Sequence, residues 1–384
     1  MSESIRLFVA CAPGLEPLLV DELRELELEI DRSLAGGVEL SGEPETLYRV
    51  LLGCGLGLRV LVRITGFVAR EFAKLERELD RIDWRHWIRP GEVIEVRATA
   101  RRSRLYHTGA IVERVERAIA RQLDVAVPSD RGEPTTSVYL RNEGDRIEVS
   151  IDACGAPLHK RGWRVESGKA PLREDIARAL LRLVGFEADW GLLDPVAGSG
   201  TLVIEAATIA AGLAPGIGRE FACMRWPDFD TAAFARAQAR FVVPASKAPL
   251  PPIHGRDRNQ GAVAIAKANA ARAGVGDRVE FEARSLGDRE LPLDLRAWVG
   301  HVALVGNPPW GQRVGDVARL RNLYASFGQL ARTLARTRPI EVALVTPDRM
   351  LAGATGLGLT ARVWTDQGGT RIGLWTGSLA PMGH

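Results

Sequence analysis

A chain of 384 residues is longer than one average domain and predicts two or three domains. Hydrophobic residues make up 46% of it and charged residues 26%, which excludes a disordered, fibrous or low-complexity protein. The longest nearly apolar stretch, Leu51 to Val62, is interrupted by Arg59 and is too short to span a membrane. The N-terminus, Met1 to Ser4, carries an acid and no basic segment typical of a secretory signal, so we expect a cytoplasmic protein.

Basic residues cluster, although the net charge is only +3. Between Arg97 and Arg121 the chain has seven arginines and two glutamates. A second cluster consists of Lys160, Arg161, Arg164, Lys169 and Arg173. Any one of these side chains could simply be a solvent-exposed charge on the surface of a helix. Two clusters of one sign in a chain of nearly balanced charge favour a polyanionic partner.

The cysteines and histidines give no sign of a metal or redox site. The four cysteines, Cys11, Cys54, Cys154 and Cys223, lack the paired spacing that such sites need. The six histidines also lack ligand spacing. We therefore expect reduced cysteines that pack as small apolar residues, and no bound metal.

The first part of the chain alternates predicted strands and helices. Hydrophobic periodicity predicts a strand over Ile5 to Ala10 and a helix over Leu15 to Leu26. A strand over Val38 to Leu40, a helix over Pro44 to Leu52 and a strand over Arg59 to Gly66 follow. This order suits a small β-α-β-β-α-β module of the ferredoxin-like type.

A second module is predicted from about Val68 to Ile151. The link from Asn142 to Asp145 indicates a hairpin turn between its last two strands. The predicted elements are a helix through Leu75, Leu79 and Ile82, a strand over Val93 to Ala98, a helix over Thr108 to Leu123, and strands over Thr136 to Arg141 and Arg146 to Ile151.

Beyond Leu158, long helices alternate with short apolar strands that end in Gly, Pro or Asp. This rhythm predicts a parallel sheet covered by helices. The tail, Ala361 to Thr376, turns at Gln367-Gly368-Gly369 and is expected to form a hairpin that adds an antiparallel edge strand. The predicted parallel strands are Leu192 to Asp194, Ile253 to Asp257, Val279 to Ala283, Val302 to Gly306 and Ile340 to Pro347.

A Gly-rich turn, Asp194-Pro195-Val196-Ala197-Gly198-Ser199-Gly200-Thr201, leads from the first of these strands into a helix over Thr201 to Gly212. Nucleotides, dinucleotides and S-adenosyl-L-methionine all use such turns. A P-loop needs lysine where this chain has Thr201, and a dinucleotide fingerprint needs Gly or Ala where it has Val203. Neither pattern is met. The helix starts with a hydroxyl and an apolar run, so Gly198 and Gly200 would let the backbone approach a ligand that carries its own carboxylate.

An acid ends the next predicted strand. The carboxylate of Asp257 can accept hydrogen bonds from two ribose hydroxyls at once. The same residue could instead cap the helix expected over Asn259 to Ala273. Together with the turn before it and the motif described next, Asp257 favours S-adenosyl-L-methionine as the ligand.

The segment Asn307-Pro308-Pro309-Trp310 is typical of a pocket for an amino group on a planar ring. The lone pair of such an amine is delocalised, so two acceptors must hold its hydrogens. The side-chain oxygen of Asn307 and the carbonyl of Pro308 can do this, and prolines offer no competing N–H. Trp310 can stack on the base. The alternative is a rigid turn after a buried strand.

These residues resemble those of THUMP-domain class I RNA methyltransferases. Within that family the chain is similar to the group that contains the N-terminal half of the bifunctional bacterial large-subunit rRNA guanine-N2 methyltransferase. The similarity includes Leu7 to Glu16, Leu158 to Arg164 and Ala170 to Glu174 as well as both motifs.

The resemblance implies a ferredoxin-like module over residues 1–67, a THUMP domain that binds structured RNA over 68–157, and an α/β, Rossmann-like methyltransferase domain over 158–384. The last would contain a mostly parallel seven-stranded sheet with an antiparallel edge hairpin.

The resemblance also implies site residues. The family's target-base contacts carry over to Asn307, Pro308 and Trp310, and its cofactor contacts to Asp194, Gly198, Gly200, Thr201 and Asp257. We further predict that the base contacts Pro309 and that S-adenosyl-L-methionine contacts Arg173, Pro195, Ala197, Ser199, Arg258, Ser285 and Asn307. The basic clusters predict RNA phosphate contacts from Arg101, Arg102, Arg104, Lys160, Arg161 and Arg164.

Three departures from the family pattern stand out. Trp310 replaces the usual tyrosine, which keeps the stack but loses a phenol. The family's acid for the adenine amino group is absent from Ala283-Arg284-Ser285-Leu286, so either Asp288 compensates or the cofactor is held less tightly. The second methyltransferase domain of the bifunctional protein is absent, so one modification is expected.

We therefore predict an S-adenosyl-L-methionine-dependent RNA guanine-N2 methyltransferase, with large-subunit (23S) rRNA as its expected substrate. A tRNA guanine-N2 methyltransferase is the alternative, and adenine-N6 specificity is a weaker third. A catalytically silent RNA-binding or ribosome-assembly factor is the alternative from another class, which the missing acid allows. The expected partner is structured RNA, with no membrane or metal, and the protein is expected to be a monomer.

Overall fold

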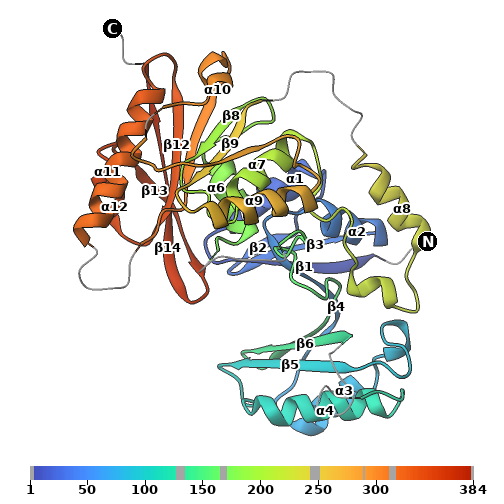
Figure 1. Cartoon of the computed structure of the whole chain (residues 1–384). Helices are drawn as coiled ribbons and strands as arrows, with labels where there is room; N and C mark the ends of the chain where they lie inside the picture. Colours follow the sequence, from blue (N-terminus) through green and yellow to red (C-terminus); the bar gives the residue numbers. More distant parts are fainter. Residues whose placement is uncertain are drawn as a thin grey trace. The chain divides into compact units, whose positions relative to one another are not determined.

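The computed structural model describes residues 4–126, 135–164, 171–242, 251–288, 290–310 and 317–381. The chain forms two compact units (Figure 1). Unit 1 contains Met1–Cys11, Leu23–Leu158 and Gly218–Arg240, and unit 2 contains Ala12–Glu22, His159–Ile217 and Phe241–His384. The chain therefore passes from one unit to the other five times.

Unit 1 is built on one seven-stranded sheet with the strand order β2-β3-β1-β4-β7-β6-β5. All neighbours in it are antiparallel except β5 and β6, which are parallel. Its elements are β1 (Ile5–Cys11), β2 (Arg32–Leu34), β3 (Gly37–Gly42), α2 (Pro44–Gly53), β4 (Gly57–Val68), α3 (Phe72–Leu79), β5 (Ile94–Arg101), α4 (Thr108–Ala120), β6 (Thr136–Glu143), β7 (Arg146–Asp152), α8 (Thr231–Ala239) and short 3-10 turns at Trp84–His86 and Ala222–Arg225.

The predicted elements of this unit are confirmed, with small shifts at their ends. The strand β2 is an addition, since no separate strand was placed near Arg32. Strand β4 pairs with β1 on one side and with β7 on the other, so one continuous sheet runs through both predicted N-terminal modules. Leu47 and Leu51 on the inner side of α2 are almost fully buried, as the periodicity of that helix predicts.

Unit 2 contains a second seven-stranded sheet, with the order β10-β9-β8-β11-β12-β14-β13. Helix α1 (Glu16–Glu25) starts within its first segment. The other elements are α6 (Glu174–Leu183), β8 (Gly191–Asp194), α7 (Thr201–Ala210), β9 (Ile253–Asp257), α9 (Gln260–Arg272), β10 (Glu280–Ala283), α10 (Leu293–Ala297), β11 (Val302–Gly306), α11 (Val317–Leu334), β12 (Ile340–Thr346), α12 (Arg349–Ala354), β13 (Thr360–Gln367) and β14 (Thr370–Leu379).

The five strands from β10 to β12 are parallel, and helices cover both faces of the sheet (Figure 1). Helices α6, α7 and α9 lie on one face and α11 and α12 on the other. Every residue of the central strands β8 and β11 is buried, which explains their unbroken apolar sequences. The predicted Rossmann-like α/β fold is confirmed.

The hairpin at the C-terminal end of this sheet corrects one detail of the prediction. Strand β14 is antiparallel to both β12 and β13, and it lies between them. The antiparallel strand is therefore second from the edge. The edge strand, β13, runs in the same direction as the parallel strands. After β12 the chain first forms β13 at the edge, and then turns back to form β14 between β12 and β13.

Candidate active site

A cavity of about 1180 Å³ lies at the carboxyl ends of the parallel strands in unit 2. Ligands of open α/β sheets bind at these ends. The cavity brings together Asp194 at the end of β8, Asp257 at the end of β9 and Asn307 directly after β11. Its lining includes Pro195, Ala197, Gly198, Ser199, Thr201, Arg258, Ser285, Pro308, Pro309 and Trp310.

The two glycines of the turn have different structural roles. Both Gly198 and Gly200 have a positive φ, at 54° and 87°, which favours glycine. A Cβ atom on Gly198 would meet no other atom within 4 Å, so the backbone there faces open space. A Cβ on Gly200 would lie 3.0 Å from the Phe281 ring and 3.1 Å from the Ala266 methyl group. Gly198 leaves room for a ligand, whereas Gly200 allows close packing behind the turn.

Neighbouring elements hold the turn in place. The Ala197 N–H donates to the carbonyl of Arg256 at 2.8 Å. On α9, the fully buried Asn269 donates from Nδ2 to the carbonyl of Ser199 at 3.1 Å. Sequence reasoning missed Asn269, although a lone amide in the alanine-rich stretch of α9 was a usable signal. The turn is thus fixed before any ligand binds.

Asp194 is 1% exposed, and its Oδ1 atom accepts the Val196 N–H at 3.0 Å. Burial raises the pKa of the Asp194 carboxyl to about 8, and the charge of Asp257 adds to this effect. The Val196 N–H acts in the opposite direction. Burial thus favours the protonated form of this carboxyl.

Asp257 is half-buried and bonds to two backbone groups. Its Oδ2 atom accepts the Gly198 N–H at 3.1 Å, and its Oδ1 atom accepts the Asn259 N–H at 2.8 Å. The cap of α9 is the side chain of Asn259, which accepts the Gly261 N–H at 2.9 Å. Each carboxylate oxygen of Asp257 keeps acceptor capacity for a ligand hydroxyl.

The loop after β10 offers no acid to the cavity. Ser285, Leu286 and Gly287 line it, but Asp288 does not. The carboxylate of Asp288 instead lies 3.3 Å from the guanidinium of Arg284 and accepts the Glu290 N–H at 3.1 Å. Compensation by Asp288 is thus contradicted, because an ion pair directs this side chain elsewhere.

The Asn307-Pro308-Pro309-Trp310 segment forms a wall of the same cavity. The Oδ1 atom of Asn307 is buried and has no hydrogen-bond partner among the described residues. Trp310 donates from Nε1 to the carbonyl of Val345 at 3.2 Å, which fixes the plane of the indole. A buried acceptor without a partner is costly unless a ligand satisfies it.

A helix provides a further wall that sequence reasoning did not anticipate. Arg319, Asn322, Leu323 and Ser326 of α11 line the cavity together with Leu320. Their spacing of three or four residues places them on one stripe of the helix. The spacing itself was the available signal, but it could not indicate which cavity the stripe would face.

The basic residues assigned to RNA divide into two groups. Arg101, Arg102 and Arg104 in unit 1 and Lys160 in unit 2 are exposed. The side chain of Arg161 is only 4% exposed and lies 3.4 Å from the buried carboxylate of Glu205. Arg161 is therefore withdrawn from the predicted phosphate contacts, because its charge is neutralised inside unit 2.

Arg164 is also directed inward. Its guanidinium donates to Glu174 at 3.0 Å, to the Leu172 carbonyl at 2.9 Å and to the Thr201 hydroxyl at 2.8 Å. It stabilises the start of α7 and is likewise withdrawn from the RNA contacts. The predicted basic residue Lys169 lies outside the described residues.

Two of the predicted cofactor contacts do not line the cavity. Gly200 packs behind the turn, as described above. Arg173 donates from Nε to Asp175 at 2.9 Å, while its neighbours Pro171 and Leu172 reach the cavity instead.

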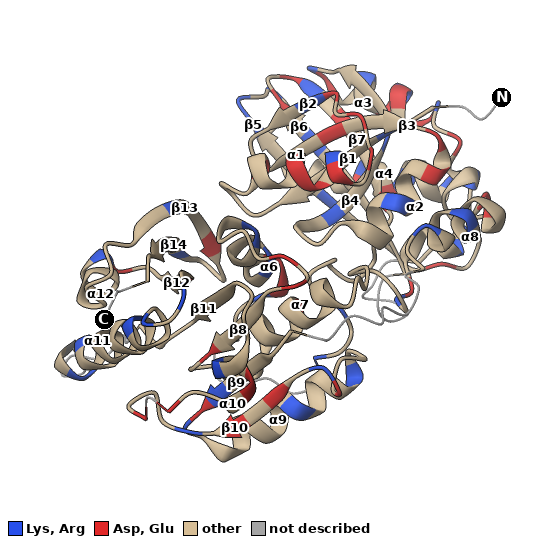
Figure 2. Cartoon of the chain, turned by 90° about the horizontal axis from the view of Figure 1, so that it is seen from above, with Lys and Arg blue, Asp and Glu red and all other residues tan. Residues whose placement is uncertain are grey.

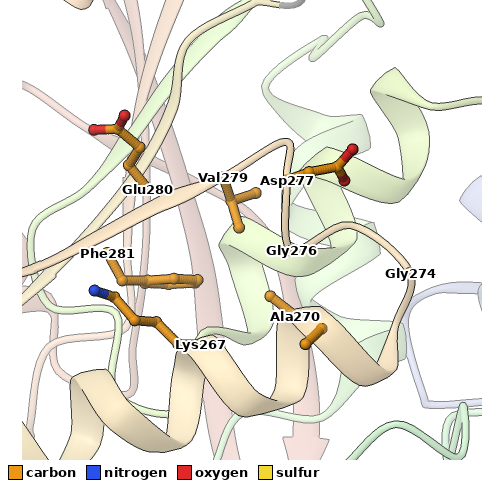
Figure 3. Close-up of a pocket in the computed structure, with 9 residues that line it drawn as sticks. Lys267, Ala270, Gly274, Gly276, Asp277, Val279, Glu280 and Phe281 are labelled. Carbon is orange, nitrogen blue, oxygen red and sulfur yellow. The ribbon is translucent and has the colours of Figure 1, made fainter.

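A second hollow, of about 780 Å³, lies at the other end of the sheet, where α9 ends and β10 begins (Figure 3). Figure 3 shows that the charged groups of Lys267, Asp277 and Glu280 do not converge on one point. This hollow lacks a set of polar groups that could orient a ligand.

No cluster of three or more side chains suited to a metal ion occurs within the described ranges. None of the helices in those ranges is both long and apolar enough to cross a membrane.

Two family models match the sequence. One, described as an RMKL-like methyltransferase domain, matches residues 161–368, and the other, described as an RlmL ferredoxin-like domain, matches residues 6–61. These matches include the cavity and the first strands of unit 1.

Individual proteins are similar over nearly the whole chain. A ribosomal RNA large subunit methyltransferase K/L of Methylococcus capsulatus is 37% identical over 92% of this chain and 48% of its own length. A putative RNA methyltransferase of Synechocystis sp. is 29% identical over 94% of both chains. The crystal structure of a putative methyltransferase complexed with SAH has a TM-score of 0.84 and 26% identity, over 100% of this chain and 99% of that one. The chain spans about half the length of the K/L methyltransferases that it matches.

Proposed function

The chain belongs to the family of RMKL-like methyltransferase domains, and from this premise we propose that it methylates the N2 amino group of a guanosine in RNA, with S-adenosyl-L-methionine as methyl donor. The observation that carries the proposal is the buried Oδ1 atom of Asn307. It has no partner among the described residues, and Asn307 lines the cavity that also contains the Gly-rich turn and Asp257.

The residues around the cavity fit this donor. Gly198 leaves open space at the turn, where backbone amides would receive the carboxylate of the methionine part. Asp257 keeps acceptor capacity for the two ribose hydroxyls. Ser285, Leu286 and Gly287 would contact the adenine ring, without an acid to bind its amino group. S-adenosyl-L-methionine supplies a methyl group on a positively charged sulfur.

The chain's own groups would prepare the amine. The Asn307 Oδ1 atom and the Pro308 carbonyl accept its two hydrogens, which draws the nitrogen toward a tetrahedral geometry and localises its lone pair. Trp310, fixed through Nε1 to Val345, stacks on the base and orients it. No general base among these residues is required, because the nitrogen loses its proton only after it has become positively charged.

We propose large-subunit rRNA as the substrate, because the K/L methyltransferases that the chain resembles carry that name. The predicted division into a ferredoxin-like module at 1–67, a THUMP domain at 68–157 and a methyltransferase domain at 158–384 is part of this proposal. Arg101, Arg102, Arg104 and Lys160 are the proposed phosphate contacts. A monomer acting in the cytoplasm is the working assumption.

The test uses purified protein, labelled S-adenosyl-L-methionine, and rRNA and tRNA from cells that lack the protein. Nucleoside mass spectrometry identifies the product, and primer extension locates it. We expect N2-methylguanosine at one position of the large-subunit rRNA, formed far more slowly by Asn307→Ala. Product in tRNA only would favour the alternative substrate, and N6-methyladenosine would contradict the proposal. Absence of S-adenosyl-L-methionine binding in calorimetry, together with absence of any product, would favour a silent RNA-binding factor.

A further inference from the structure

The α11 wall of the cavity contains a basic side chain, that of Arg319, which has no role in the methyl transfer described above. Arg319, Asn322 and Ser326 form a polar stripe on this helix, beside the apolar Leu320 and Leu323. This wall belongs to the same cavity as Asn307 and Trp310. Its residues can therefore contact whatever base enters that cavity.

The packing of α11 places Arg319 beyond the end of β11. Phe327 contacts the last residue of that strand, since a Cβ on Gly306 would lie 3.0 Å from its ring. Because α11 connects two parallel strands, it runs back along them, and its N-terminal end lies at their carboxyl ends. Arg319 is eight residues before Phe327, or about 12 Å further in that direction. Arg319 therefore lies beyond the carboxyl end of β11, at the same end of the sheet as Asn307.

Arg319 has no charged partner among the described residues. Its exposed guanidinium makes no hydrogen bond or ion pair with any other described residue, in contrast to Arg332 on the same helix, which donates to the Thr355 carbonyl. The helix contains three arginines and no acidic residue (Figure 2). An arginine left free at the rim of a substrate cavity is available to bind acceptors of the substrate.

We propose that Arg319 determines specificity by binding the O6 and N7 atoms of the target guanine. This proposal rests on the function proposed above. When Asn307 and Pro308 hold the 2-amino group, the guanine turns its O6 and N7 acceptors toward another wall of the cavity. Two adjacent acceptors match the paired N–H groups of a guanidinium. A 2-aminopurine with an amino group in place of O6, such as 2,6-diaminopurine, would oppose the N–H donors, so Arg319 selects the 6-oxo base.

The experiment uses the RNA position mapped above. Synthetic RNA is prepared with guanine, 2,6-diaminopurine or 7-deazaguanine at that position. Both analogues keep the 2-amino group, but the first replaces O6 by an amino group and the second lacks N7. Single-turnover methylation is measured with wild type, Arg319→Ala, Arg319→Lys and Arg321→Ala. The last is the matched control, since Arg321 is exposed on the same helix but does not line the cavity.

We expect wild type and Arg321→Ala to methylate 2,6-diaminopurine roughly 10- to 100-fold more slowly than guanine. Arg319→Ala should be slowed on guanine but should discriminate only a few-fold. Arg319→Lys should be intermediate, because an ammonium cannot form the paired contact. Comparing each variant with wild type on the same RNA removes differences in the reactivity of the analogues.

Two results would overturn the specificity role. Arg319→Ala could keep the wild-type discrimination, or it could slow all three RNAs equally, as loss of a phosphate contact would. Neither result would affect the proposed function, since the wild-type enzyme would still methylate guanine. If the wild-type enzyme modifies no guanosine, the proposed function itself fails.

Discussion

Asp257, at the end of β9, holds Gly198 in the turn after the neighbouring strand β8, since its Oδ2 atom accepts the Gly198 N–H at 3.1 Å. The same carboxylate faces the cavity, so it both shapes the turn and can bind a ligand. Asp257→Ala should weaken S-adenosyl-L-methionine binding by about 2 kcal/mol or more, the scale of charge-assisted hydrogen bonds. Calorimetry on the folded variant measures this. Asp288→Ala, which removes a neighbouring carboxylate outside the cavity, should bind like wild type; equal affinity for all three proteins would refute the ribose assignment.

The buried carboxyl of Asp194 should make stability depend on pH. Its pKa rises from the ordinary 3.8 to about 8 on folding, so between these values the folded state holds a proton that the unfolded state has released. This group therefore lowers the free energy of unfolding as pH rises from about 4 to 8. Asp194→Asn keeps an acceptor for the Val196 N–H and removes the titration.

Urea unfolding of ligand-free protein at several pH values measures this effect. The stability of Asp194→Asn relative to wild type should increase with pH across this window and level off above it. We expect a gain of about 2 kcal/mol or more, since one pKa unit corresponds to about 1.4 kcal/mol. A stability difference that is the same at every pH would show that Asp194 does not titrate in this range.

Arg101, Arg102 and Arg104 should contribute to RNA affinity through phosphates. None of their side chains is ion-paired with another described residue, and all three are exposed. Replacing them by alanine should weaken RNA binding and reduce the slope of log affinity against log salt by about 2, as expected when contacts with two or three phosphates are lost. S-adenosyl-L-methionine binding should not change.

A second triple variant provides a control of equal charge. Arg97, Arg117 and Arg141 lie in the same unit but are paired with Glu95, Glu113 and Glu143. Because those carboxylates already neutralise them, their replacement by alanine should affect the salt slope less. If both triple variants reduce the slope equally, RNA affinity depends on the net charge of the unit and not on contacts made by Arg101, Arg102 and Arg104.

Asn307 should control the rate of methyl transfer. Its hydrogen bond strengthens as the amine becomes positively charged, so Asn307→Ala should lower kcat by roughly 100-fold with a smaller change in KM. Single-turnover measurements with the mapped RNA give the rate. Gln329→Ala removes an exposed amide of α11 that does not line the cavity, and it should have little effect. Methyl transfer at the wild-type rate by Asn307→Ala would mean that another group holds the amine.

Trp310 should act mainly in base docking. Trp310→Ala should raise KM because the stack is lost, a loss of roughly 1 to 3 kcal/mol. Trp310→Tyr and Trp310→Phe keep a ring but lose the Nε1 donor to Val345. If stacking dominates, both should retain most activity. Low activity in both, with normal folding, would instead assign the main role to the hydrogen bond that fixes the indole.

Local patterns in the sequence were sufficient to predict most of this fold. Strands β8 and β11 are buried on both faces, so they are short apolar runs with no alternation. Each ends at a Gly or an Asp, and this pattern identifies them in the sequence. The turn after β8 and the segment after β11 meet because parallel strands bring their carboxyl ends to one edge. Motifs and the family resemblance grouped Asp194, Asp257 and Asn307, and the topology explains why they line one cavity.

Contacts between distant segments could not be predicted in this way. Arg161 was expected on the surface because the residues around it are basic, but Glu205, which neutralises it, is 44 positions further along the chain. The stripe on α11 was missed for a similar reason, since periodicity shows that a helix has a face but not what the face meets. The same holds for β14, whose place inside the sheet depends on a pairing with β12 that leaves no local signal.

The repeated passage of the chain between the two units affects how the protein can fold during synthesis. Unit 1 remains incomplete until Gly218–Arg240 has left the ribosome, and unit 2 uses Ala12–Glu22, which is made first, together with strands that are made last. The Glu22 carboxylate lies 3.0 Å from the guanidinium of Arg178, so a protein cut before residue 158 would leave that cation without this partner. Neither unit can therefore finish folding while only the N-terminal part of the chain has been made. A single cut in the chain cannot separate the two units, because each consists of several segments that would have to be joined again.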